Sequence, residues 1–237
     1  VAWNWKADNT SGTSNTDGTI TSTVSANPTA GFSIVSYTGT GSAATVGHGL
    51  TSQPEMVIIK RRGAAIDWAV YTDVVDGSWD FLYLNTTAAK SNSLVFSADA
   101  DTFDFSTSAN VANVSGAAAI AYCFHSVEGY SKFGSYTGNG STDGPFVYTG
   151  FRPALTLIKR ANGSGYSWIL HDNKRVGYNP NDANLLPNSS GAERSYDIDY
   201  LSNGFKLRDT TTNVNGSGGT YIYMAFAENP FKYSNAR

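Results

Sequence analysis

The chain has 237 residues and a formal net charge of −3, from 16 Lys and Arg against 19 Asp and Glu. This balance argues against a nucleic-acid partner, because proteins that bind nucleic acid normally have a basic stripe. No apolar run reaches the roughly 18 residues of a transmembrane helix. We therefore expect neither nucleic acid nor membrane as a partner. The one cysteine, Cys123, excludes an intrachain disulfide, and the combination of 15% charged with 13% aromatic residues is typical of half-buried pleated surfaces.

The first 30 residues are predicted to hold one strand and a linker. Ala2-Trp3-Asn4-Trp5 is similar to Ala121-Tyr122-Cys123-Phe124, so we interpret residues 1–6 as the last strand of a preceding unit or as a strand that completes a later domain. Residues 8–31 are rich in Asn, Thr, Ser and Gly, which indicates a linker with an edge-strand candidate at 19–25. Because the chain begins with Val, we expect a processed product or a fragment.

An internal repeat is the main feature of the sequence. Pro54–Arg61 matches Pro153–Arg160 at a spacing of 99 positions, and Ser36–Gly39 matches Ser135–Gly138 at the same spacing. Further matches lie 100 positions apart: Trp68 with Trp168, Asn113-Val114 with Asn213-Val214, and Glu128 with Glu228. We therefore expect two copies of one β-domain, at residues 31–130 and 131–237.

Strand patterns recur along both copies, with Gly, Asn and Asp turns between them. The first copy has them at 32–37, 56–59, 68–71, 81–84, 94–96, 103–105 and 118–124, and the second at 155–158, 168–170, 185–186, 205–207 and 221–226. No segment combines a helical apolar period with caps at both ends. The sequence predicts an all-β chain of two tandem β-sandwich, jelly-roll-like repeats with very little helix, and leaves the strand order open.

Four segments carry a family resemblance: Ala30–Gly39, Thr45–Leu50, Val127–Tyr136 and Ala227–Phe231. Over nearly its whole length the chain resembles an uncharacterised repeated β-domain of large virion proteins of marine and cyanobacterial phages, often fused to concanavalin-A-like lectin domains. The resemblance implies a tail-fibre, tail-tip or head-decoration protein on the virion surface, assembled in the host cytoplasm. It also implies a genuine C-terminus and a truncated N-terminus, and it supplies no catalytic residues.

Three aromatic residues are the candidate ligand-binding side chains. Trp79 lies in the turn-like segment Asp76–Asp80, and Tyr166 and Tyr178 lie in polar segments of the second copy. Exposed rings at these positions would stack on a sugar ring of a host surface polysaccharide. For Trp79 the favoured alternative is that its indole covers the end of its own sandwich.

Two pairs of alternating carboxylates are the weak Ca²⁺ candidates: Asp99 with Asp101, and Asp197 with Asp199. Neither segment has a full calcium loop, so solvated turns are the favoured interpretation and no cofactor is expected. Lys60-Arg61-Arg62 and Lys159-Arg160 are interpreted as strand ends rather than anion contacts, and Cys123 as a small buried thiol. No pair of carboxylates is singled out for glycoside hydrolysis, so we predict no enzymatic activity.

Three hypotheses follow. The first is a non-enzymatic virion structural protein whose partners are copies of itself and other virion proteins. The second is a carbohydrate-binding adhesin module, which is compatible with the first. The third, a glycan-degrading enzyme, requires two carboxylates facing each other across a cleft.

Overall fold

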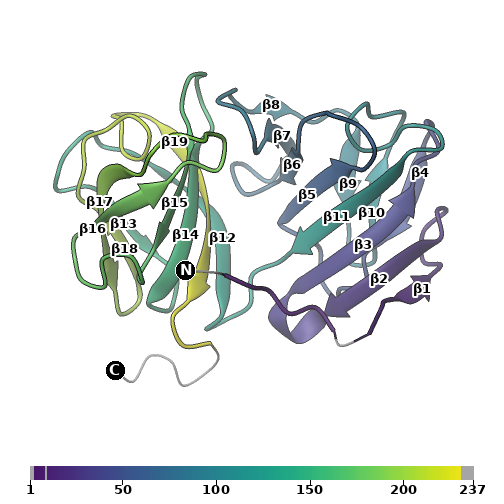
Figure 1. Ribbon diagram of the computed structural model, residues 1–237, viewed down its shortest axis with the longest axis horizontal. Coiled ribbons are helices and arrows are strands. Elements are labelled where there is room, and N and C mark those ends of the chain that lie inside the picture. The colour runs from purple at the N-terminus through teal and green to yellow at the C-terminus, as the bar shows by residue number, and fades with distance from the viewer. Residues whose placement is uncertain (1–2, 9, 231–237) are drawn as a thin grey trace. The chain divides into compact units, whose positions relative to one another are not determined.

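The computed structural model describes residues 3–8 and 10–230, and its regular secondary structure consists almost entirely of antiparallel strands (Figure 1). In this part of the chain the only helical element is the single 3₁₀ turn η1 (Pro28–Ala30). The prediction of an all-β chain of β-sandwich repeats with very little helix is therefore confirmed. None of the described helices is long and apolar enough to cross a membrane.

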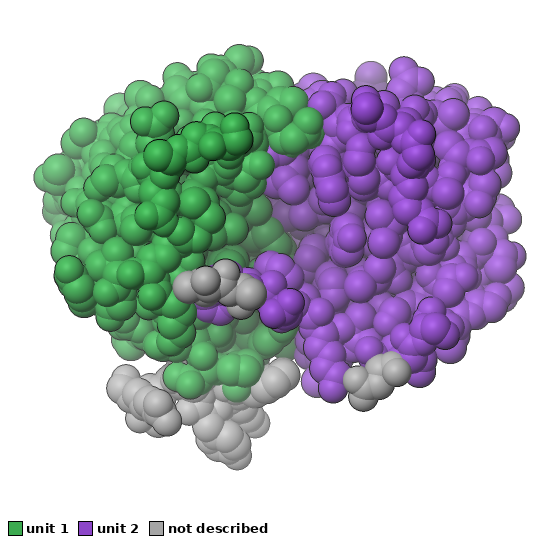
Figure 2. Space-filling model, in the orientation of Figure 1, with its two compact units in different colours: residues 1, 85–90, 126–237 green, residues 2–84, 91–125 purple. Residues whose placement is uncertain are grey.

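The described residues divide into two compact units (Figure 2). Unit 2 contains residues up to 84 and residues 91–125, and so holds the first copy of the repeat. Unit 1 contains residues 126–230 together with the short segment 85–90, whose Lys90 N–H donates to the Ala161 carbonyl at 2.8 Å.

Unit 2 is a sandwich of an eight-stranded and a three-stranded sheet. The larger sheet has the order β1 (Thr13–Asn15), β2 (Ser22–Asn27), β3 (Phe32–Thr38), β11 (Ala118–Phe124), β5 (Met56–Arg61), β6 (Ala69–Thr72), β7 (Asp80–Tyr83) and β8 (Ser91–Asn92). The smaller sheet has the order β4 (Ala44–Gly47), β10 (Thr102–Phe105) and β9 (Phe96–Ala98). Alternating side chains of both sheets fill the space between them.

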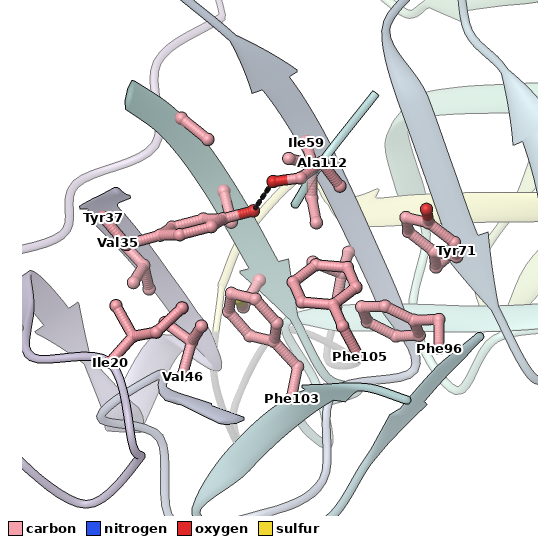
Figure 3. Close-up of a cluster of buried hydrophobic side chains, with 14 of the residues drawn as sticks. Ile20, Val35, Tyr37, Val46, Ile59, Tyr71, Phe96, Phe103, Phe105 and Ala112 are labelled. Carbon is pink, nitrogen blue, oxygen red and sulfur yellow. Dashed lines mark hydrogen bonds between the residues drawn. The ribbon is translucent and has the colours of Figure 1, made fainter. Parts of the chain in front are cut away.

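Aromatic rings dominate this core (Figure 3). Tyr71 stacks on Phe96 with ring centroids 4.0 Å apart, and Phe96 is also close to Phe103 and Phe105. The Tyr37 hydroxyl donates to the Ala112 carbonyl at 2.9 Å, so its polar end is satisfied inside the core. Burial of such rings is the main source of stability for a sandwich of short strands.

Unit 1 repeats this plan in one continuous eight-stranded sheet. Its order is β12 (Ser131–Thr137), β19 (Thr220–Ala227), β14 (Pro153–Arg160), β15 (Trp168–Asp172), β16 (Asn181–Leu185), β17 (Arg194–Leu201), β18 (Gly204–Leu207) and β13 (Phe146–Tyr148). Strand pairing makes β12, β13, β14, β15, β16, β18 and β19 the counterparts of β3, β4, β5, β6, β7, β10 and β11. The long β17 corresponds to β8 and β9 together, because it pairs with the counterparts of both β7 and β10.

Hydrogen bonds correct the register of the repeat near its end. Tyr37 and Tyr136 are equivalent, and their hydroxyls donate to the carbonyls of Ala112 and Val214 respectively. Asn113 therefore corresponds to Asn215, and the apparent match with Asn213 is wrong. Between the equivalent tyrosine and asparagine the second copy has three additional residues, which loops absorb without disturbing the strands.

Residues 13–27, which their composition indicated as part of a linker, form β1 and β2 on the edge of β3. Ile20 and Val24 from this segment are only 7% and 4% exposed and belong to the unit 2 core. Residues 3–6 do not form the expected strand, and residues 1–2 lie outside the described residues. The prediction of a linker was wrong here because β2 has a polar face toward solvent and a second face that packs on the core.

Candidate ligand-binding site

An open pocket of about 370 Å³ lies entirely within unit 2. One wall is aromatic, from Tyr71 of β6 and from Phe81 and Tyr83 of β7. The facing walls come from Asn92 at the end of β8, from residues 93–95 between β8 and β9, and from the turn at residues 108–111. This size falls in the range of small-molecule sites, which are about 300–1,000 Å³.

The pocket exists because the strand that would continue across it is interrupted. Three residues, 93–95, separate β8 from β9, whereas β17 passes the same point with two residues between Ser195 and Ile198. The additional residue pushes Leu94 outward, where its side chain is 88% exposed. An inserted residue disrupts a ladder locally in this way, and here it separates the two sheets.

The same place in unit 1 is closed. Paired positions on the strands show that Tyr71 and Phe81 correspond to His171 and Asn184, both fully buried. His171 Nε2 donates to the Tyr196 carbonyl of β17 at 2.8 Å, which ties the continuous strand over this position. Burial lowers the pKa of His171 to about 4, so this imidazole is neutral at physiological pH.

The aromatic wall is held rigidly. Tyr71 and Phe81 have ring centroids 5.1 Å apart, and Phe81 meets Tyr83 edge to face at 4.7 Å. Burial raises the pKa of Tyr71 well above its ordinary value, so its hydroxyl stays protonated. Phe81 and Tyr83 are partly exposed and present apolar ring surface to the pocket.

The rest of the lining is polar but uncharged. Asn92, Ser108 and Asn110 are exposed and bring amide and hydroxyl groups to the rim. The Asn110 carbonyl accepts from Arg61 Nη1 at 2.9 Å, which fixes the turn that carries it. No Asp, Glu, Lys, Arg or His lines the pocket. Such a lining suits a neutral ligand with both C–H surface and hydroxyl groups.

Trp79, the first predicted stacking residue, is turned toward the interior. Its ring is partly buried, packs against the unit 2 core and meets Phe96 edge to face at 4.9 Å. Its carbonyl accepts from Ser93 N–H at 2.7 Å, next to the interruption that opens the pocket. Trp79 therefore braces the pocket wall through its backbone and is not part of the lining.

Tyr166 and Tyr178, the other two predicted stacking residues, lie in unit 1 and do not form one platform. They fall in the loops before and after β15, which places them at opposite ends of that strand. The Tyr178 side chain is 71% exposed, whereas the Tyr166 ring is covered by the Arg160 guanidinium at 4.3 Å.

The first calcium candidate is a hairpin turn. Asp99 Oδ1 accepts from the N–H groups of Asp101 and Thr102 at 2.9 and 2.7 Å, between β9 and β10. These backbone hydrogen bonds, that from Thr102 first, lower the pKa of Asp99. The carboxylate of Asp99 thus serves the turn itself.

The second calcium candidate, on β17, has neighbours of both signs. Arg208 Nε donates to Asp199 Oδ2 at 2.5 Å. Burial raises the pKa of Asp197, and the nearby carboxylates of Asp209 and Asp182 raise it further. Among the residues that the structure describes, no group of three or more His, Cys, Asp or Glu side chains is arranged to hold a metal ion.

The repeated basic pairs hold loops. Lys60 Nζ donates to the carbonyls of Ala64 and Ile66, and the fully buried Lys159 donates to the Tyr166 carbonyl at 2.7 Å. Burial lowers the pKa of Lys159 to about 8. Cys123 is fully buried in β11, and burial raises the pKa of its thiol to about 12.

The sequence did not indicate the residues of the pocket. Tyr71, Phe81 and Tyr83 read as ordinary alternating strand residues, and their accessibility depends on one additional residue between β8 and β9. A register comparison of the two copies around Leu94 is the signal that would have pointed there.

Comparison with known proteins gives one family. A family model described as "Domain of unknown function (DUF7483)" matches residues 1–230. No curated protein and no solved structure matches the chain.

Proposed function

We propose that this chain, which belongs to the DUF7483 family of unknown function, is a non-enzymatic structural and attachment module on the surface of a bacteriophage particle. We further propose that unit 2 binds a neutral saccharide of the host surface. The observation that carries the saccharide part is the pocket between Tyr71, Phe81 and Tyr83 on one side and the rim of Asn92, Ser108 and Asn110 on the other.

The pocket chemistry supports a sugar ligand. A pyranose ring has C–H faces that pack on aromatic rings and hydroxyl groups that need amide and hydroxyl partners. Phe81 and Tyr83 provide the aromatic rings for the C–H faces, and Asn92 and Asn110 provide amide partners for the hydroxyl groups. The uncharged lining favours neutral hexoses over uronic or sialic acids, since a buried carboxylate would have no cation to pair with.

The placement on a phage particle rests on the resemblance to virion proteins and on the character of the chain. Two covalently joined sandwiches with Gly, Ser, Thr and Asn as the main polar residues suit an exposed, repeated architectural element. The pocket lining contains no carboxylate and so lacks the acid and base of glycoside hydrolysis, which supports binding over cleavage.

Binding is tested on an array of neutral and anionic glycans with the wild-type chain, Tyr83→Ala and Tyr178→Ala. We expect wild-type binding to neutral glycans, and a loss of about tenfold for Tyr83→Ala because a stacked ring contributes on the order of 1 kcal/mol or more. Tyr178→Ala is the matched control, because this exposed tyrosine lies outside the pocket.

Two results would overturn the proposal. One is the absence of wild-type binding to any neutral glycan. The other is an equal loss for the two tyrosine variants, which would place the saccharide elsewhere on the chain.

A further inference from the structure

The outer edge of β4 in unit 2 is covered by a strap formed by residues 18–22. Ile20 N–H donates to the Thr45 carbonyl at 3.0 Å, and Thr45 N–H donates to Thr19 Oγ1 at 2.9 Å. Ser22 Oγ then donates to the Gly47 carbonyl at 3.0 Å. Ile20 forms a parallel bridge with Val46 and buries its side chain in the core. The strap thus provides hydrogen-bond partners for the outward-facing backbone groups of β4, and it covers the core of the sandwich beside this edge.

In unit 1 the counterpart of this edge is β13. Val46 pairs with Phe103 and Val147 pairs with Phe205, so Thr45 and Gly47 correspond to Phe146 and Tyr148. Leu207 N–H donates to the Pro145 carbonyl and Thr149 N–H to the Asn203 carbonyl, which makes positions 145, 147 and 149 the ones that face β18. By alternation, the backbone groups of Phe146 and Tyr148 point to the outer edge.

This edge of β13 is exposed among the described residues. The Phe146 and Tyr148 side chains are 44% and 65% exposed, although both are large aromatic residues. β13 pairs only with β18 in the part of the chain that the structure describes. An open edge of this kind is a template for pairing with another chain.

Among the described residues, unit 1 has no segment of its own that acts as a strap. In unit 2 the strap and β2 precede β3, whereas in unit 1 only residues 125–130 connect β11 to β12. The consequence is visible at Tyr136, which is partly exposed, while its counterpart Tyr37 is only 4% exposed in the cluster that contains Ile20 and Val24. Within the part of the chain that the structure describes, the strap is therefore present in unit 2 and has no counterpart in unit 1.

We propose that the β13 edge of unit 1 accepts an extended segment of a partner polypeptide, paired in parallel as residues 18–22 pair with β4. The partner segment is uncharged and has the chemistry of the strap: a hydroxyl residue opposite the N–H of Phe146, an aliphatic residue next to it, and a hydroxyl residue near the Tyr148 carbonyl. A glycine or another small residue precedes these positions in the partner segment, because the equivalent Gly18 of the strap lies close against the Thr45 carbonyl. This joins the chain to its neighbours without using the saccharide pocket.

The probe is a synthetic peptide with the sequence of Gly18–Val24, added to the full isotope-labelled chain and followed by amide NMR. We expect shifts at the amides of Phe146 and Tyr148, with hydrogen exchange slowed by about fivefold or more at saturation. A control peptide with Ile20→Pro lacks the N–H that would bond to the Phe146 carbonyl, and should have no effect.

A protein variant separates edge pairing from contact with the aromatic rings. Phe146→Pro removes the outward N–H, and proline is tolerated at such a position of an edge strand. It should abolish the peptide effect, whereas Phe146→Ala should retain it. The Ile20→Pro peptide keeps the test valid on the wild-type chain if the proline variant does not fold.

The proposal is overturned if the two peptides act alike or if neither changes these amides. It is also overturned if the amides of residues 146–148 shift with protein concentration in the absence of peptide, because the β13 edge then pairs with a second copy of itself.

Discussion

Asn113 and Asn215, 102 positions apart, make the same three hydrogen bonds in the two units. Asn113 Oδ1 accepts from Thr40 N–H at 2.9 Å, and its Nδ2 donates to the Ser42 and Thr107 carbonyls at 2.7 and 3.2 Å. The equivalent bonds of Asn215 are to Asn139 N–H, Ser141 and Asp209 at 2.9, 2.8 and 2.9 Å. Both residues are fully buried. This amide holds the glycine-rich loop after the first strand of each repeat.

Asn215→Ala should lower the free energy of unfolding of unit 1 by about 3 kcal/mol, because a fully buried amide is removed and the three backbone groups that it bonds lose their partner. Asn213→Ala should cost less, since Asn213 is only partly buried and one of its two hydrogen bonds is 3.4 Å long. Urea unfolding of both variants measures the difference. A larger cost at Asn213 would contradict the register of the repeat.

Lys159 should give unit 1 a stability that rises with pH in the alkaline range. Burial lowers its pKa to about 8 from its ordinary value of 10.5, so between these values the unfolded chain binds more protons than the folded one. The free energy of unfolding of the wild type should therefore gain about 2 kcal/mol relative to Lys159→Met between pH 7.5 and 9.5. Buried tyrosines affect both proteins equally. A difference that stays flat would mean that Lys159 is solvated.

Substitution of Trp79 should lower the stability of unit 2 and should have little direct effect on saccharide binding. Trp79→Ala removes the edge-to-face contact with Phe96 and should destabilise unit 2 by about 3 kcal/mol. Trp79→Phe should recover most of this and keep saccharide binding within about twofold, because the carbonyl that holds Ser93 remains. Loss of binding in a Trp79→Phe protein of wild-type stability would assign the indole to the ligand instead.

Saccharide binding should be nearly independent of ionic strength. The pocket lining has no charged side chain, so the dissociation constant should change by less than about twofold between 50 and 500 mM salt. Calorimetry at these salt concentrations measures it. A steep weakening with salt would point to an anionic ligand held by cations outside the pocket.

The strands and the repeat could be predicted because both depend on local patterns. The apolar run of β5 and its copy in β14 are similar in sequence, and alternation indicated most of the other strands. The role of residues 13–27 could not be predicted in this way, since a Ser- and Thr-rich strand with one buried face has the composition of a linker. The pocket was missed for another reason. It arises from a single additional residue near Leu94, which changes pairing between strands and leaves no mark in the pattern of either strand.

The exposed aromatic residues show the same limit. Trp79 was singled out by its polar neighbours, yet its ring points into the core because Phe96, distant in sequence, lies beside it. Phe146 and Tyr148 alternate around Val147 as in any strand. Their exposure follows from the absence of a strap in the second copy, which only the comparison of the two units reveals.

The most direct test of the saccharide site is chemical-shift mapping of the full chain with a neutral glycan that it binds. We expect the largest shifts on residues 81–83, 92–95 and 108–111, and we expect them to disappear in Tyr83→Ala. Shifts centred instead on the loops that carry Tyr166 or Tyr178, with residues 81–83 unchanged, would contradict the proposed site.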